Sequence, residues 1–170
     1  MQHFALPKDG GLKEKEVTRE ILHTYEKIEA EIFDDPVEGS EVIADIIIKA
    51  INAHGKGPEK DRLFKLGLTT GTTPISLYNW LATKYKGGEV SFRNVEIFSI
   101  DEYYPVSADA PQSRNRRLHD AFIDKVDVQM GNVHIPDGMV PREQISEYCR
   151  EFDRKARGMD LLIIGMGEQG

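Results

Sequence analysis

The sequence contains a single cysteine, Cys149, and fewer basic than acidic residues. One cysteine excludes an intramolecular disulfide, and no cysteines and histidines have the spacing of a zinc site. We therefore expect a reduced, cytoplasmic location. With 22 basic against 29 acidic residues, the net charge is −7. This balance argues against a surface that binds nucleic acid or an anionic membrane.

Long apolar runs are also missing. The most apolar stretch, residues 42–51, is interrupted by Asp45 and Lys49, so it is too short and too polar to cross a bilayer. The first residues lack the basic start and apolar core of a signal peptide. We expect residues 1–15 to form a flexible arm, because they contain Pro7 and adjacent glycines. A single α/β domain is expected over residues 16–170.

Strand-like and helix-like patterns alternate along the rest of the chain. Asp35 is a natural helix N-cap and Pro36 suits a first helical position, and apolar residues then recur at helical spacing to residue 51. Further helices are predicted at 74–85, 113–123 and 141–156, and strands at 30–33, 63–68, 95–100, 132–135 and 161–164. This alternation predicts a parallel sheet flanked by helices. The all-apolar strand at 161–164 predicts burial on both faces.

The loop after the strand at 63–68 has the composition of an anion site. It consists of Thr69-Thr70-Gly71-Thr72-Thr73-Pro74, at the carboxyl edge of the sheet, where ligands of such folds bind. Gly71 permits a close backbone approach, the threonines supply hydroxyls, and a helix begins at Pro74 with Thr73 as its N-cap. The motif lacks the lysine of a P-loop. A plain capped turn explains the pattern equally well.

Two adjacent carboxylates, Asp101 and Glu102, follow the strand at 95–100. We expect them to face the same edge of the sheet as the threonine loop. A carboxylate there can act as a general base that removes a proton from a carbon next to a carbonyl. Adjacent carboxylates can also tune one another's protonation. The alternative is a solvated strand exit in an Asp turn.

Two weaker patterns remain. Gly165, Gly167 and Gly170 match G-x-G-x-x-G after an apolar strand, the fingerprint of dinucleotide binding, but on the last strand rather than the first. Basic residues also cluster after Ser113, at Arg114, Arg116 and Arg117. They either help to hold an anion or form a solvated helix face.

Four segments together resemble the first half of the glucosamine-6-phosphate deaminase/isomerase family. In order, they are LGLTTGTTP, SFRNVEIFSIDEYYPV, NVHIPDG and DLLIIGMGEQG. The resemblance runs from about Glu31 to the last residue, and the spacing agrees as well as the order. The related 6-phosphogluconolactonases typically carry Asp-Glu-Arg where this chain has Asp101-Glu102-Tyr103. The tyrosine therefore favours the aminosugar branch.

The resemblance implies a Rossmann-like fold, no metal and no cofactor, and a homo-oligomer when the fold is complete. The implied reaction converts an aminosugar phosphate to fructose 6-phosphate and ammonia, with a carboxylate moving a proton from C2 to C1. By motif match, Asp101 is that carboxylate, with Glu102 beside it in the catalytic turn. The implied phosphate ligands are Thr70, Gly71, Thr72 and Thr73. The implied active-site loop includes Gly167, Gln169 and Gly170.

The chain departs from the family pattern in three ways. Thr72 stands where the phosphate loop usually has a second glycine. Gln169 stands where the family commonly has an aspartate, and an amide does not orient or charge-stabilise a catalytic histidine as a carboxylate does. The family's ring-opening histidine and downstream glutamate are not in the sequence. We expect a chain truncated at its C-terminus and inactive alone. A non-catalytic sugar-phosphate-binding or regulatory domain is one alternative, and a dinucleotide-binding domain is a less favoured one.

Overall fold

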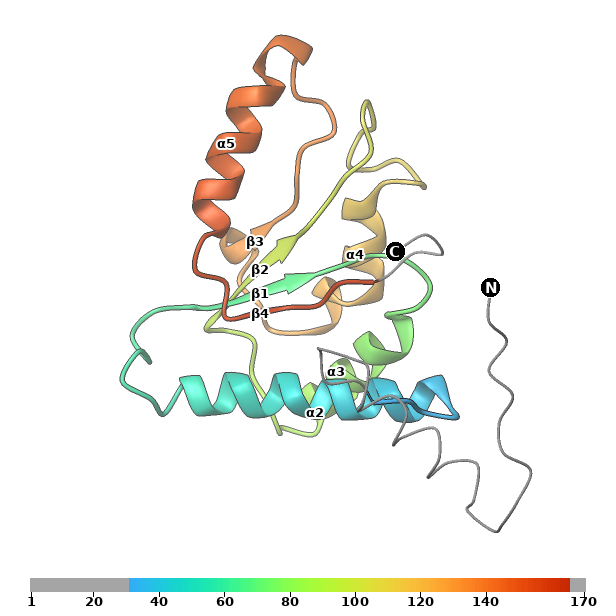
Figure 1. Ribbon diagram of the computed structural model, residues 1–170, viewed down its shortest axis with the longest axis vertical. Helices are drawn as coiled ribbons and strands as arrows, with labels where there is room; N and C mark the ends of the chain where they lie inside the picture. Colours follow the sequence, from blue (N-terminus) through green and yellow to red (C-terminus); the bar gives the residue numbers. More distant parts are fainter. Residues whose placement is uncertain (1–30, 166–170) are drawn as a thin grey trace, which may run out of the picture. The chain divides into compact units, whose positions relative to one another are not determined.

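The computed structural model describes residues 31–165. From residue 35 onward they belong to one compact unit. Residues 1–15, expected to be an arm, lie outside the described part, so the proposed domain boundaries stay a prediction. The elements, drawn in Figure 1, are α2 (Pro36–His54), β1 (Phe64–Leu68), α3 (Ile75–Lys86), β2 (Val95–Ser99), α4 (Arg114–Ala121), β3 (Val133–His134), α5 (Ile145–Ala156) and β4 (Leu161–Leu162), with three short 3-10 segments.

The four strands form one parallel sheet in the order β3-β2-β1-β4. Leu66 of β1 is paired with Ile97 of β2 on one side and with Leu161 of β4 on the other. Because all pairs are parallel, the carboxyl ends of the strands lie at one edge. The predicted α/β class with helices flanking a parallel sheet is confirmed. No helix within residues 31–165 is long and apolar enough to cross a membrane.

The first described helix begins as its sequence predicts. The Asp35 side chain accepts a hydrogen bond of 2.8 Å from the Val37 amide, and Pro36 occupies the first turn. The cap satisfies an amide that has no partner inside the helix. Apolar side chains spaced by three and four residues then face the core, including Ala44, Ile47 and Ile51.

One face of the sheet forms the apolar core with α2, α3 and α4. Alternate residues of the central strands point into it, including Leu66, Leu68 and Ile97, all fully buried. Burying one such side chain contributes roughly 1.5–3 kcal/mol. This packing fixes where β1 and β2 end, and so where the loops that follow them begin.

The opposite face is covered more thinly by α5 (Figure 1). The Phe152 ring of α5 meets the buried Phe98 ring edge-on, with centroids 6.1 Å apart. Beside Phe98 this face is polar, because His134 Nε2 lies 2.8 Å from Glu96 Oε1. Polar residues on the sheet are acceptable here because each has a partner.

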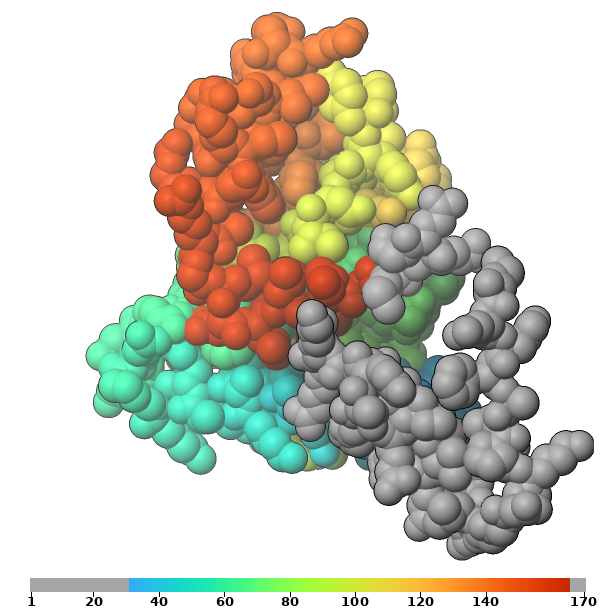
Figure 2. Space-filling view, viewed as in Figure 1, coloured from blue at the N-terminus to red at the C-terminus, as the bar shows by residue number. Residues whose placement is uncertain are grey.

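Two sequence expectations fail at the ends of the described chain. Residues 31–33 have no regular structure, so the strand predicted at 30–33 is wrong over them, and residue 30 lies outside the described part. The strand predicted at 161–164 is limited to Leu161–Leu162. It is not buried on both faces, since Leu162 is 46% and Ile164 66% exposed. The reason is its place at the end of the strand order, and Figure 2 shows this segment at the surface between α5 and α2.

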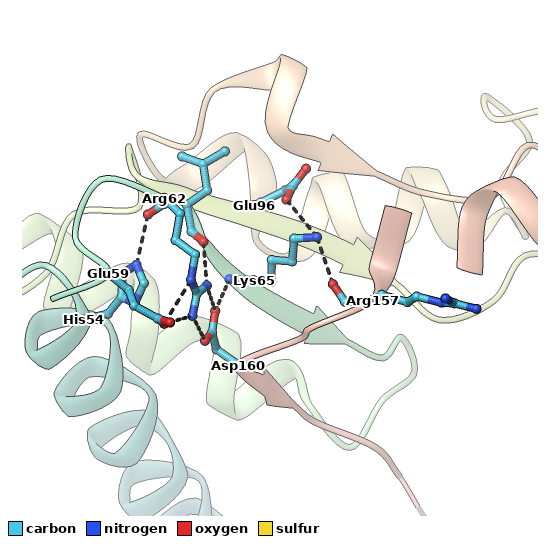
Figure 3. A network of polar contacts seen from close by, with 8 residues as sticks. His54, Glu59, Arg62, Lys65, Glu96, Arg157 and Asp160 are labelled. Atoms are coloured by element: carbon cyan, nitrogen blue, oxygen red, sulfur yellow. Dashed lines mark hydrogen bonds and ion pairs between the residues drawn. The ribbon is translucent and has the colours of Figure 1, made fainter. Parts of the chain in front are cut away.

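A polar network fastens the start of β4 to the start of β1 (Figure 3). The Arg62 guanidinium donates to both oxygens of Asp160, at 2.7 and 2.6 Å, and also to Glu59. Asp160 also accepts from the Lys65 amide at 2.8 Å. The hydrogen bonds from Arg62 are the main reason why the pKa of Asp160 lies below its ordinary value. The network lies at the amino ends of the strands, at the edge opposite the threonine loop.

This network also contains the one described set of side chains spaced for a metal ion. One ligand atom each of His54, Glu59 and Asp160 lies within 4.8 Å of the others. The Arg62 guanidinium already binds both carboxylates, and His54 Nε2 lies 2.9 Å from the Arg62 carbonyl oxygen. A cation would have to displace a bound cationic group, so we assign these residues to fastening the strands.

Candidate functional site

The threonine loop follows β1 at the carboxyl edge of the sheet. Gly71 has a φ of 139°, a conformation that favours glycine. Thr72 and Thr73 are exposed, and the Ile75 amide donates to the Thr72 carbonyl at 3.3 Å. The expected N-cap role of Thr73 is wrong. The cap residue of α3 is Pro74, and no side chain caps the helix. The Ile75 amide in the first turn instead donates to a backbone carbonyl, that of Thr72.

Tyr78 of α3 contacts the start of this loop. Its hydroxyl, one turn into α3, donates to the Thr69 carbonyl. The ring is 1% exposed and stacks on Phe122, with centroids 5.3 Å apart. Burial raises the pKa of this phenol, so it stays a protonated donor. The sequence gives no signal that Tyr78 belongs to the site, because its helical spacing indicates only packing.

Asp101 lies just beyond β2, at the same edge. Its side chain is 47% exposed, yet its Oδ1 atom is buried and has no hydrogen-bond partner within the described residues. The Ser99 hydroxyl, on a fully buried residue, donates to the Asp101 backbone carbonyl at 3.4 Å. The carboxylate is thus partly exposed to solvent at the end of a fixed turn, and its buried Oδ1 oxygen accepts no hydrogen bond from the described residues. Such an arrangement suits a proton acceptor.

Glu102 has a different environment from its neighbour. Its carboxylate accepts four hydrogen bonds of 2.7–2.9 Å, from the amides of Tyr103, Arg114 and Asn115 and from the Ser113 hydroxyl. Two of these amides belong to the first turn of α4, where amides lack partners inside the helix. Partial burial by itself would raise the pKa of Glu102, but the four donors together outweigh it and hold that pKa below its ordinary value.

These contacts favour a structural role for Glu102. Its four donors stabilise the ionised form, and a carboxylate so engaged is a weak proton acceptor. The expectation that Asp101 and Glu102 tune one another's protonation stays a prediction. So do the catalytic assignments of Glu102 and Asp101.

Arg114 connects the two loops. Its Nη1 donates to Thr70 Oγ1 at 2.8 Å, and its Nε lies 3.4 Å from Asp101 Oδ2. The guanidinium carbon also lies 4.7 Å from the centre of the Tyr103 ring, a distance typical of a cation–π contact. The other two arginines of the cluster do not take part: Arg116 binds the Asp109 carbonyl and Arg117 is exposed.

Gly138 allows the loop between β3 and α5 to pack against the turn that carries Asp101 and Glu102. The Val106 amide donates to the Gly138 carbonyl at 3.1 Å. A Cβ at Gly138 would lie 2.3 Å from the Val106 carbonyl oxygen and 2.5 Å from that of Tyr103. Both are backbone atoms, so only a glycine fits without a shift of the turn that carries Asp101 and Glu102.

The structure therefore brings part of the predicted site together. Thr70 and Asp101 share Arg114 as a partner, while Gly71, Thr72 and Thr73 lie on the same loop as Thr70. Gly167, Gln169 and Gly170 lie outside the described residues, so the expected third loop and the dinucleotide fingerprint stay untested.

Comparison with known proteins places this geometry in a family context. A sequence profile described as glucosamine-6-phosphate isomerases/6-phosphogluconolactonase matches residues 34–170. A glucosamine-6-phosphate deaminase-like protein of Bacteroides thetaiotaomicron is 34% identical over 89% of this chain and 23% of its own length. A glucosamine-6-phosphate deaminase of Thermoanaerobacter pseudethanolicus is 42% identical over 62% of this chain and 42% of its own length.

Solved structures give the same result. A monomeric glucosamine-6-phosphate deaminase superimposes with a TM-score of 0.71 at 26% identity, over 82% of this chain and 56% of that one. A 6-phosphogluconolactonase of Thermotoga maritima gives a TM-score of 0.64, also at 26% identity, over 81% of this chain and 59% of that one. The chain thus spans a quarter to three-fifths of the length of these relatives.

Proposed function

Because the chain belongs to the glucosamine-6-phosphate isomerase/6-phosphogluconolactonase family, we propose that it binds an aminosugar 6-phosphate and supplies the proton-transfer carboxylate of a deaminase/isomerase. The observation that carries the proposal is the placement of two groups. The threonine loop, suited to a phosphate, and Asp101, suited to a base, lie at one edge of the sheet and share Arg114.

The phosphate end of the proposal rests on the loop after β1. Gly71 has a positive φ, and α3 begins four residues after it. The positive end of a helix dipole favours an anion beside the first turn. The hydroxyls of Thr70, Thr72 and Thr73 add donors. We assign the 6-phosphate to Thr70, Gly71, Thr72 and Thr73.

The chemical end rests on the unequal environments of the two carboxylates. Asp101 is exposed on one side and incompletely hydrogen-bonded, whereas Glu102 is occupied by four donors. We therefore assign proton transfer between C2 and C1 to Asp101. Glu102 holds the turn in place.

A lactonase is the second candidate, because the structural neighbours include 6-phosphogluconolactonases. Both candidates require a phosphate at one end of the ligand, so the threonine loop does not separate them. Tyr103 and the deaminase relatives at 34–42% identity favour the aminosugar. The homo-oligomer implied by the resemblance stays a prediction.

Deuterium exchange tests the proposal on the chain as it stands. Glucosamine 6-phosphate is incubated with the protein in heavy water, and deuterium at C2 is followed by NMR beside an ammonia assay and a lactone-hydrolysis assay. The chain alone is expected to release no ammonia, but removal of the C2 proton from the open-chain form of the sugar needs the base and not the ring-opening histidine. We therefore expect exchange at C2 above the buffer rate, which Asp101→Asn lowers by about 10²-fold or more, while Asp153→Asn on the exposed side of α5 leaves it unchanged. Binding without exchange would overturn the base assignment, and lactone hydrolysis without exchange would favour the second candidate.

A further inference from the structure

One side chain joins the two halves of the proposed site. Arg114, the first residue of α4, reaches Thr70 on the loop after β1 and Asp101 on the loop after β2. Its Nη2 also donates to the Tyr103 hydroxyl at 3.1 Å. Its side chain is only 19% exposed, so the guanidinium is held between these groups rather than extended into solvent.

We propose that Arg114 is a positioning residue that aims the Thr70 hydroxyl at the ligand's phosphate and holds the Asp101 carboxylate. The inference rests on the proposed function. A guanidinium can only donate hydrogen bonds. When Thr70 Oγ1 accepts from Arg114, the single hydroxyl proton of Thr70 is left to donate to another acceptor, such as a phosphate oxygen. Arg114 thereby fixes the direction in which Thr70 donates.

The contact with Asp101 is a second, separate observation. Arg114 Nε and Asp101 Oδ1 are both buried, and neither has a hydrogen-bond partner within the described residues. Buried polar atoms without partners are uncommon in proteins, and a catalytic role or a bound water or ion is among the reasons for them. The Nε atom is 3.4 Å from Oδ2, close enough for a small rotation to form a hydrogen bond. A ligand bound between the two loops would favour this rotation and so hold the carboxylate in place.

The position of Arg114 is itself fixed by the start of α4. The Ser113 side chain accepts from the Arg116 amide and donates to Glu102, and Glu102 accepts from the Arg114 amide. The backbone of Arg114 is therefore anchored to the carboxylate turn. The Tyr103 ring then limits the directions in which its side chain can extend. Arg116 and Arg117, on the same helix, lack these contacts.

The test measures binding of inorganic phosphate and glucosamine 6-phosphate to the 170-residue chain by titration calorimetry. Arg114→Gln should weaken phosphate binding about tenfold, since a charge-assisted hydrogen bond is lost. Arg117→Gln removes the same charge from the same helix and should change binding less than about twofold. Arg114→Lys keeps the positive charge but replaces the planar guanidinium and its several donors with a single ammonium group, so it should bind phosphate better than Arg114→Gln but less well than the wild type.

A double-mutant cycle separates positioning from a general loss of charge. Thr70→Val removes the hydroxyl through which Arg114 is proposed to act. In that background Arg114→Gln should cost less than about threefold, compared with about tenfold in the wild type. An equal cost in both backgrounds would overturn the action through Thr70. Thermal melting of each variant checks that the loss is not unfolding. If Arg114→Gln does not fold, Arg114→Lys takes its place, and unchanged binding by it overturns the inference.

The outcomes distinguish this inference from the proposed function. If the wild type binds both ligands and Arg114→Gln binds as Arg117→Gln does, Arg114 has no positioning role and the proposed function stands. If the wild type binds neither ligand, both are overturned. If Arg114→Gln weakens binding and the cycle shows coupling to Thr70, the positioning role is supported.

Discussion

Glu102 offers the sharpest test of the argument that one carboxylate of the pair is structural. The substitution Glu102→Gln keeps the size of the side chain but replaces one acceptor oxygen with an NH2 group, which cannot accept a hydrogen bond. Each carboxylate oxygen accepts two of the four bonds. Two donors therefore lose their acceptor. Whichever oxygen is replaced, one of the two is an amide in the first turn of α4, that of Arg114 or that of Asn115.

The expected loss follows from what those donors are. A hydrogen bond to a charged acceptor contributes about 1.5–3 kcal/mol, and removing a helix cap costs about 1 kcal/mol. Because the site is only partly buried, water recovers some of the loss. We expect Glu102→Gln to lower the free energy of unfolding by about 2 kcal/mol at pH 7. Glu151→Gln, on the exposed side of α5, should stay within about 0.5 kcal/mol of the wild type.

The assay is urea unfolding followed by circular dichroism at several pH values. The folded-state pKa of Glu102 is lowered, so its contribution is fully present above the unfolded pKa, about 4.3, and is lost as the pH falls through the folded pKa. The gap between wild type and Glu102→Gln should be constant from neutral pH to about 5 and should shrink below about 4. Equal stability at pH 7, or a gap that persists unchanged in acid, would refute the reasoning.

Two further predictions address the packing around the site and the fastening of the strands. Gly138→Ala should cost about 1–3 kcal/mol in unfolding free energy, because its Cβ meets two backbone carbonyls. Gly131→Ala, where a Cβ has nothing within 4 Å, is the matched control, and equal stability of the two variants would contradict the close-approach argument. Asp160→Asn should lower the urea midpoint at pH 7 more than Asp153→Asn does. That difference should disappear as the pH falls below about 3.9. The pKa of Asp160 is lowered because its ionised carboxylate binds Arg62, and protonation removes that charge. A difference that survives in acid would contradict the ion-pair explanation.

The sequence predicted the central elements of the fold because their signals are local. The Asp35 cap, Pro36 and the apolar spacing of α2 are all contained in one segment. It did not predict the exposure of Leu162 and Ile164, because apolar strands at the centre and at the edge of a sheet have the same local pattern. The position of β4 in the strand order depends on the crossover from β3, which no short segment encodes.

The candidate site shows the same division. Its loops were predicted because the carboxyl ends of parallel strands share an edge. The selection of Arg114 from three nearby arginines was not predicted, since it depends on a contact with Thr70, 44 residues away in sequence. A usable signal was present in Ser113: a helix cap there places the next residue at the start of the helix. Tyr78 carried no such signal, because a buried helical tyrosine usually reflects packing.

The unequal environments of Asp101 and Glu102 suit the proposal that Asp101 is the base and Glu102 a structural residue. Asp101 has few hydrogen bonds of its own, so its position must be set by its neighbours. The Glu102 carboxylate ties the turn to α4, Ser99 holds the Asp101 carbonyl, and Arg114 limits the carboxylate itself. A base tied down by the same four donors as Glu102 would be precise but reluctant to accept a proton. Placing those donors on the adjacent residue fixes the turn and leaves Asp101 able to react.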